Sequence, residues 1–213
     1  MTQEPDLVGE GLACRRGERL VFEGLPFRLP AGGALVVSGA NGSGKSSLLR
    51  LVASLFAPAA GRLLWGGRPV ADDLAPYRAR LEYVGHLDAV KPALSPRDML
   101  RFWAALRGAG AAAPIDRALS AFALDAVADW PCRWLSAGQR RRLSLARLCL
   151  APAPIWLLDE PFAALDRANQ ARLEAAIEAH RAAGGRVMLA THQPLALAGA
   201  DSLALDDFAR RPG

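Results

Sequence analysis

The feature that most constrains this chain is a glycine-rich stretch at residues 38–47, SGANGSGKSS. It fits the pattern GxxxxGK[ST] and lies between an apolar run, ALVVSG at 34–39, and a segment at 46–56 with helical spacing of its leucines. Glycines let several backbone N–H groups turn toward one phosphate chain, and the helix start adds positive partial charge. The stretch therefore predicts a phosphate-binding loop, whose candidate contacts are Gly39, Ala40, Asn41, Gly42, Ser43, Gly44, Lys45, Ser46 and Ser47.

Two adjacent carboxylates follow a second apolar run, APIWLLDE at 153–160. A phosphate-binding loop of this kind needs an acidic residue at the end of a neighbouring buried strand to help hold Mg²⁺. Asp159 fits that role together with the hydroxyl of Ser46, and Lys45 can reach the outer phosphates. Glu160 stands at the strand exit, where it can act as a general base toward an attacking water.

Strands alternate with helices along most of the chain, which indicates an α/β protein with a mostly parallel core sheet. Residues 88–150 differ, because their pattern is helical and alanine-rich, and we expect them to form an inserted lobe. Residues 1–213 are expected to form one domain, with a core at about 1–87 and 151–213 and a helical subdomain at about 88–150. Strands are expected at 7–14, 19–29, 34–39, 62–65, 81–85, 153–160 and 186–192, and a helix at 167–183.

Composition narrows the class of partner. The net charge of +5 and the pI near 9.7 permit nucleic acid or an anionic membrane surface, but the arginines are scattered. Three cysteines without a CxxC pair indicate a reducing compartment. The polar N-terminus does not fit a signal peptide, and no stretch approaches the ~18 apolar residues of a membrane span. We therefore expect a soluble protein whose membrane contacts come through a partner.

A second candidate anion site lies at residues 135–142, LSAGQRRR, where Ser136 can cap a helix. With these motifs the chain resembles the nucleotide-binding subunits of ABC transporters, whose signature is LSGGQ, with Ala137 here in place of the first glycine. The resemblance implies a P-loop NTPase fold with an N-terminal antiparallel β-subdomain, with ATP and Mg²⁺ as cofactors.

In that family the signature binds the γ-phosphate of ATP held by the P-loop of a facing subunit. The resemblance thus implies a dimer of two copies that ATP closes, with Ser136, Gly138 and Gln139 gripping the neighbour's nucleotide. Asp166, in ALD at 164–166, would lie at the dimer seam, and His192 would sense the γ-phosphate. His180 is expected to be an ordinary helix-surface residue.

The chain departs from the family pattern at two places. Relatives carry a glutamine where this chain has His86, after the run LEYVG. Because imidazole is a poor ligand for Mg²⁺, we hypothesise that His86 contacts water or phosphate and couples ATP to the lobe; the alternative is a spacer without a catalytic part. Relatives also stack an aromatic ring on adenine, whereas CRRGER at 14–19 offers only Arg16, whose guanidinium plane can stack on the base.

Within the superfamily the chain is most similar to the ATP-binding subunit of the haem exporter of cytochrome c biogenesis. The similarity rests on YVGHLDAVK, THQPL and WLSAGQRRRLSLARL. It implies an integral membrane permease as partner and a peripheral place on the cytoplasmic face of the inner membrane. ATP hydrolysis would drive haem export or release of a haem-loaded chaperone. The alternative is the ATPase subunit of an ABC transporter for another substrate; no nucleic-acid partner is expected, and no haem-ligand motif such as CxxCH is present.

Overall fold

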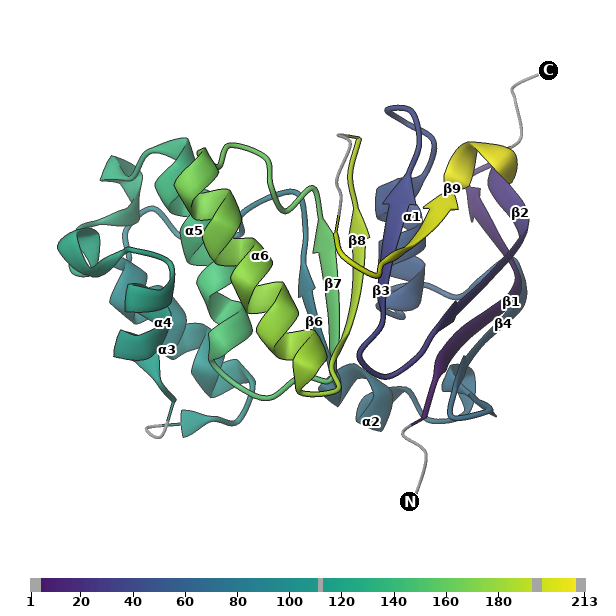
Figure 1. Cartoon of the computed structure of the whole chain (residues 1–213), viewed down its shortest axis with the longest axis horizontal. Coiled ribbons are helices and arrows are strands. Elements are labelled where there is room, and N and C mark those ends of the chain that lie inside the picture. The colour runs from purple at the N-terminus through teal and green to yellow at the C-terminus, as the bar shows by residue number, and fades with distance from the viewer. Residues whose placement is uncertain (1–4, 111–112, 193–196, 210–213) are drawn as a thin grey trace.

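The computed structural model describes residues 5–110, 113–192 and 197–209. Two sheets form its framework, with a group of helices at the end of the molecule opposite the smaller sheet (Figure 1). Among the described residues, no helix is both long and apolar enough to cross a bilayer.

The core sheet has five strands in the order β6-β7-β8-β3-β9, and every neighbouring pair is parallel. The parallel core sheet predicted from the strand–helix alternation is thus confirmed. Because β3 lies between β8 and β9, the P-loop strand is held by two segments from the C-terminal part of the chain. The strands span Ala34–Ser38 (β3), Leu81–Val84 (β6), Ile155–Asp159 (β7), Arg186–Ala190 (β8) and Asp201–Ala204 (β9).

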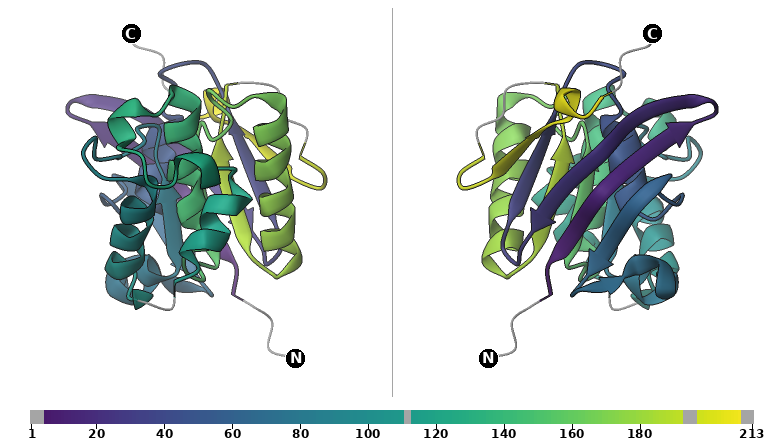
Figure 2. Two further views of the ribbon diagram at one scale, coloured as in Figure 1. Left: turned by 90° about the vertical axis from the view of Figure 1, so that its left-hand side faces the viewer. Right: turned by 90° about the vertical axis from the view of Figure 1, so that its right-hand side faces the viewer.

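The second sheet is antiparallel, in the order β2-β1-β4-β5, and it covers the opposite end of the molecule (Figure 2, right). The predicted N-terminal antiparallel β-subdomain is therefore confirmed as well. Its strands span Leu7–Arg16 (β1), Arg19–Leu29 (β2), Ala60–Trp65 (β4) and Arg68–Pro69 (β5).

Helices α3, α4 and α5 gather beyond the free edge of β6 (Figure 2, left), and all three lie between β6 and β7 in the chain. The α-helices span Lys45–Val52 (α1), Leu74–Ala79 (α2), Pro96–Leu106 (α3), Ile115–Ala121 (α4), Ala137–Ala146 (α5) and Arg167–Ala182 (α6). Short 3₁₀ turns span Val70–Asp72, Asp125–Val127, Cys132–Trp134, Arg147–Cys149 and Leu205–Asp207.

Side chains alternate between the two faces of the core sheet, so both faces are buried. Leu157 and Met188 face a cluster that includes α1 and the antiparallel sheet. Trp156 and Leu158 face a second cluster, built with α6 and the helices of the lobe. The apolar runs that lack strict alternation in the sequence are explained by this burial on both faces.

Two expectations differ from the structure. The helix expected at 46–56 ends at Val52, because Ser54 adopts a left-handed backbone conformation with φ of 53° and turns the chain toward Pro58. Strand β9 was not expected, because its four residues carry no strong apolar pattern and three of them are exposed. Ser95 caps the start of α3, since its hydroxyl accepts a hydrogen bond from the Asp98 amide.

Candidate nucleotide site

A cleft of about 690 Å³ opens at the C-terminal ends of the core strands, between the P-loop and the β1–β2 turn. This is where parallel α/β sheets bind ligands, because loops and helix starts converge there. The cleft is lined by Arg16, Arg19, Val21, Asn41, Gly42, Gly44, Lys45, Ser46, Ser47, Arg50, His86, Glu160, Ala163 and His192.

The P-loop connects β3 directly to α1, whose first residue is Lys45. Gly44 adopts φ of 109°, and a Cβ there would lie 2.4 Å from a methyl carbon of Val21, so only glycine fits. Lys45 is 7% exposed, and its ammonium donates to the carbonyl oxygens of Gly39 (2.8 Å) and Ala40 (3.0 Å). The loop therefore curls around the amine. The first residues of α1 line the cleft, and a helix start leaves its first backbone N–H groups without partners inside the helix, which suits an anion.

Asp159, the last residue of β7, is fully buried beside this loop. The Ser46 hydroxyl donates to its Oδ1 at 3.0 Å, while its Oδ2 has no hydrogen-bond partner among the described residues. A buried carboxylate oxygen without a donor suits a hard divalent cation, which prefers oxygen ligands and keeps the rest of its shell for water and phosphate. Ser46 and Asp159 thus fit the chemistry of a Mg²⁺ site.

Glu160 and His192 meet at the mouth of the cleft, where His192 Nδ1 lies 3.0 Å from Glu160 Oε1. They come from the ends of the adjacent strands β7 and β8, and the Glu160 amide donates to the Ala190 carbonyl. Glu160 has φ of 49°, a conformation that non-glycine residues rarely adopt and that is often found at functional sites. Residues 193–195, which complete the THQPL stretch, lie outside the described residues.

His86 and Arg16 also line the cleft, as do Arg19 and Arg50, which the sequence analysis did not single out. Arg16 and Arg19 pair across the turn between β1 and β2, so two guanidinium groups flank the entrance. Among the described residues, no Phe, Trp or Tyr side chain lines this cleft. Arg19 could have been found from the sequence, because the short turn between β1 and β2 places it opposite Arg16.

The signature residues lie outside this cleft. Ser136 caps α5: its hydroxyl accepts from the Gln139 amide, and the Gln139 side-chain oxygen accepts from the Ser136 amide at 2.8 Å. A Cβ at Gly138 would lie 3.0 Å from the Ala164 carbonyl, which explains a glycine there. Asp166 caps α6. The hydrogen bond that its carboxylate accepts from the backbone N–H of Asn169 lowers the pKa of the carboxyl.

Two further residues that contact the site, Asp206 and Arg141, were not found from the sequence either. Asp206 accepts a hydrogen bond from the Ala40 amide at 3.1 Å and so fixes the first turn of the P-loop from 166 residues away. Arg141 of α5 donates to backbone carbonyls at the end of β7, and its burial lowers the pKa of the guanidinium. Neither contact has a local sequence signal, since both join segments that are distant in the chain.

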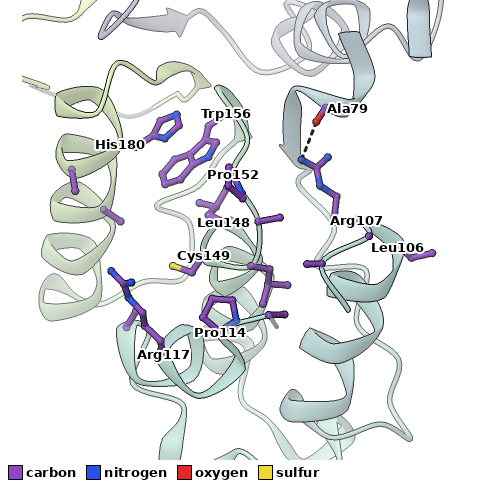
Figure 3. Close-up of a pocket in the computed structure, with 18 of the residues that line it drawn as sticks. Ala79, Leu106, Arg107, Pro114, Arg117, Leu148, Cys149, Pro152, Trp156 and His180 are labelled. Atoms are coloured by element: carbon purple, nitrogen blue, oxygen red, sulfur yellow. Dashed lines mark hydrogen bonds between the residues drawn. The ribbon is translucent and has the colours of Figure 1, made fainter. Parts of the chain in front are cut away.

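A larger groove, about 1220 Å³, lies between the lobe and the core at the opposite ends of the strands (Figure 3). His180 lines it and stacks on Trp156, with ring centroids 3.9 Å apart and planes 4° from parallel. The expectation that His180 is an ordinary helix-surface residue is therefore wrong: the ring packs on β7, and its burial lowers its pKa to about 4.

The two sheets, the helices between β6 and β7 and the cleft together define an ATP-binding domain of the ABC class. The family profile described as ABC transporter matches residues 22–163. The chain is 60% identical to the cytochrome c biogenesis ATP-binding export protein CcmA of Rhodospirillum rubrum, over 96% of this chain and 88% of that protein. It is 48% identical to the CcmA of a Pseudomonas putida strain, over 89% of this chain and 90% of that protein. The chain belongs to the ABC transporter family and, within it, to the CcmA proteins.

Solved structures show the same fold. A putative ABC transporter ATP-binding protein from Pyrococcus furiosus matches 96% of this chain and all of that chain, with a TM-score of 0.83 and 22% identity. A bacterial Atm1-family ABC exporter with ATP bound matches 91% of this chain and 35% of that chain, with a TM-score of 0.78 and 24% identity. As a member of this family, the chain is a nucleotide-binding ATPase.

Proposed function

We propose that this chain is the ATP-hydrolysing subunit of a membrane ABC complex that acts in cytochrome c biogenesis, by exporting haem or by releasing a haem-loaded chaperone. The observation that carries the proposal is the 60% identity to a CcmA protein over 96% of the chain. The Glu160–His192 pair beside the P-loop supplies groups that this activity needs.

In the proposed mechanism Lys45 and the loop amides hold the phosphates of ATP, and Ser46 and Asp159 hold Mg²⁺. Mg²⁺, when bound, neutralises charge on the phosphates. Glu160 orients a water and takes its proton as the water attacks the γ-phosphorus and ADP leaves. His192 contacts Glu160 and the γ-phosphate and so fixes both. Most of the rate gain comes from positioning and charge stabilisation.

Adenine recognition is proposed to use arginine. Arg16 stands at the entrance of the cleft, and a guanidinium plane stacks on a base as well as forming hydrogen bonds. Stacking on a delocalised plane discriminates little between bases, so the selectivity for adenine should be low. The phosphate contacts, which every nucleoside triphosphate makes, should carry most of the affinity.

Two copies of the chain are proposed to close head to tail around two ATP molecules. Ser136, Gly138 and Gln139 lie at the start of α5 and outside the cleft of their own chain, so they are available to the γ-phosphate of a facing copy. Asp166, exposed at the start of α6, would lie at the seam.

The membrane partner is proposed to be an integral permease subunit, with this chain on the cytoplasmic face of the inner membrane. We propose residues 88–150 as the helical subdomain that contacts it, and 1–87 with 151–213 as the core. Large apolar side chains are exposed on this lobe and beside it, as a docking surface requires: Leu87 at 82%, Leu106 at 70% and Phe102 at 40%.

The test uses Glu160→Gln, which should bind ATP without hydrolysing it. The variant is purified from detergent-solubilised membranes with ATP, co-purifying proteins are identified by mass spectrometry, and a haem absorption spectrum is recorded. We expect cytochrome c maturation proteins. Recovery of a different permease would support the ATPase activity and contradict the role in cytochrome c biogenesis. The chain would then be the ATPase subunit of an ABC transporter for another substrate.

A further inference from the structure

Arg141 is the residue through which the signature helix reaches the catalytic end of its own core sheet. It lies on α5, five residues after the helix cap Ser136, and is 3% exposed. A buried guanidinium must be matched by acceptors, because an unpaired buried charge is strongly unfavourable. Its acceptors are carbonyl groups of two other segments of the chain.

The first segment is the exit of β7. One terminal nitrogen of Arg141 donates to the carbonyl oxygens of Asp159 (2.6 Å) and Glu160 (2.8 Å). The Glu160 amide is held from the other side by the Ala190 carbonyl at 2.9 Å. With both its amide and its carbonyl fixed, Glu160 stays in its left-handed conformation, φ 49°, and its carboxylate stays toward His192.

The second segment carries His86. The other terminal nitrogen of Arg141 donates to the Gly85 carbonyl at 2.8 Å and lies 3.5 Å from an oxygen of Asp88. One turn further along α5, the Ser144 hydroxyl donates to the Asp88 carbonyl. Arg141 and Ser144 therefore present one face of α5 to the backbone on both sides of His86.

We propose that Arg141 is a positioning residue that couples the two ATP sites of the dimer, because it links the start of α5 to Glu160 and His86 of the same chain. The proposal rests on the proposed head-to-tail dimer. When Ser136 grips the ATP of the facing copy, α5 is fixed, and Arg141 aligns the glutamate that acts on the chain's own ATP. ATP binding at one site of the dimer thereby aligns the catalytic glutamate of the other site.

Arg181, on α6, provides a matched control. Its guanidinium also donates to backbone carbonyls, those of Gly32 (3.0 Å), Ala198 (2.7 Å) and Gly199 (3.2 Å). These acceptors precede β3 and β9 in the chain, so Arg181 makes the same kind of helix-to-backbone contact at the ends of the strands away from the cleft.

The experiment measures ATP turnover against ATP concentration for the full chain in its membrane complex, together with ATP affinity and the melting temperature. Two coupled sites give a Hill coefficient between one and two. For Arg141→Gln we expect unchanged ATP affinity, a Hill coefficient of about one and kcat lower by roughly 10²-fold, the loss that a misplacement of about 1 Å causes. Arg141→Lys, which keeps the charge, should recover part of kcat, and Arg181→Gln should leave kcat and the Hill coefficient unchanged.

If Arg141→Gln does not fold, Ser144→Ala removes one bond of the same linkage without removing a charge, and it should lower the Hill coefficient. A wild-type Hill coefficient of one, or an equal loss of kcat in Arg181→Gln, would overturn the proposal. Absence of ATP turnover in the wild-type complex would instead contradict the proposed function.

Discussion

At the scale of single residues, His86 is the most informative departure from the family pattern. It is exposed, it lines the cleft with Glu160 and His192, and its segment is tied to α5 by Arg141. An imidazole at this place can bond to water or phosphate and at the same time move with the lobe. The arrangement supports the hypothesis that His86 senses ATP and transmits the signal to the lobe.

Replacement of His86 tests this hypothesis. We expect His86→Ala to lower kcat at least about tenfold, because a hydrogen bond to a charged group contributes roughly 1.5–3 kcal/mol. His86→Gln restores a polar group and should keep more of the rate. Steady-state ATP turnover of both variants decides the matter, and wild-type rates in both would show that His86 is only a spacer.

The sequence predicts the site well wherever a motif carries it. Glycine spacing gives the P-loop, and two acids after a buried run give Asp159 and Glu160, because each pattern is local. Asp206 and Arg141 could not be predicted, since their partners lie 166 and 18 or more residues away and an aspartate or arginine is common on any surface. The stacking of His180 on Trp156 was missed because helical spacing shows which face of α6 carries His180, and it does not show which residue of another element packs there.

At the scale of elements, α6 and β7 are joined by the His180–Trp156 stack. The burial of this imidazole lowers its pKa to about 4 from a usual value of 6.5. The neutral ring is thus the form that packs on Trp156. Below pH ~6.5 the unfolded chain takes up a proton that the folded chain resists, so the contribution to stability is full above that pH and falls until about pH 4.

We therefore expect the melting temperature to fall more steeply between about pH 6.5 and pH 4 in the wild type than in His180→Phe, which keeps a flat ring without a titrating group. The melting temperatures of both proteins are measured over this range, and the difference between them is taken at each pH. The carboxylates titrate in both proteins, so their effect cancels in this difference. Parallel curves would show that His180 is not buried as a neutral ring.

Element boundaries were predicted less well than element types. Strand β9 and the early end of α1 depend on tertiary contacts: β9 pairs with β3, and the turn after α1 is fixed by Arg78, whose guanidinium bonds to both the hydroxyl and the carbonyl of Ser54. The local preference of a segment for helix or strand does not predict contacts with distant segments. The other core strands, β3, β6, β7 and β8, were predicted because burial on both faces leaves apolar runs in the sequence.

At the scale of the whole molecule, the signature in one copy and the P-loop in the other should form one site. Lys45→Ala and Ser136→Arg should each be inactive when present in both copies. In a mixed dimer the two changes fall in the same site, and the other site keeps both native residues. ATP turnover should therefore reappear when the two variants are mixed, at a rate well below that of the wild type because the coupling through Arg141 is lost. Each variant alone is the control, and turnover no higher than that of the single variants would contradict the head-to-tail arrangement.

The contact between Asp206 and the Ala40 amide has a consequence for how the protein is made. The P-loop strand β3 is synthesised early, but both of its neighbours in the sheet, β8 and β9, belong to the last 30 residues of the 213-residue chain. A nascent chain that has emerged only through α6 lacks both neighbours of β3 and the carboxylate that fixes the loop. ATP binding should therefore require the segment that follows α6, and a chain that has emerged only through α6 should not hold nucleotide.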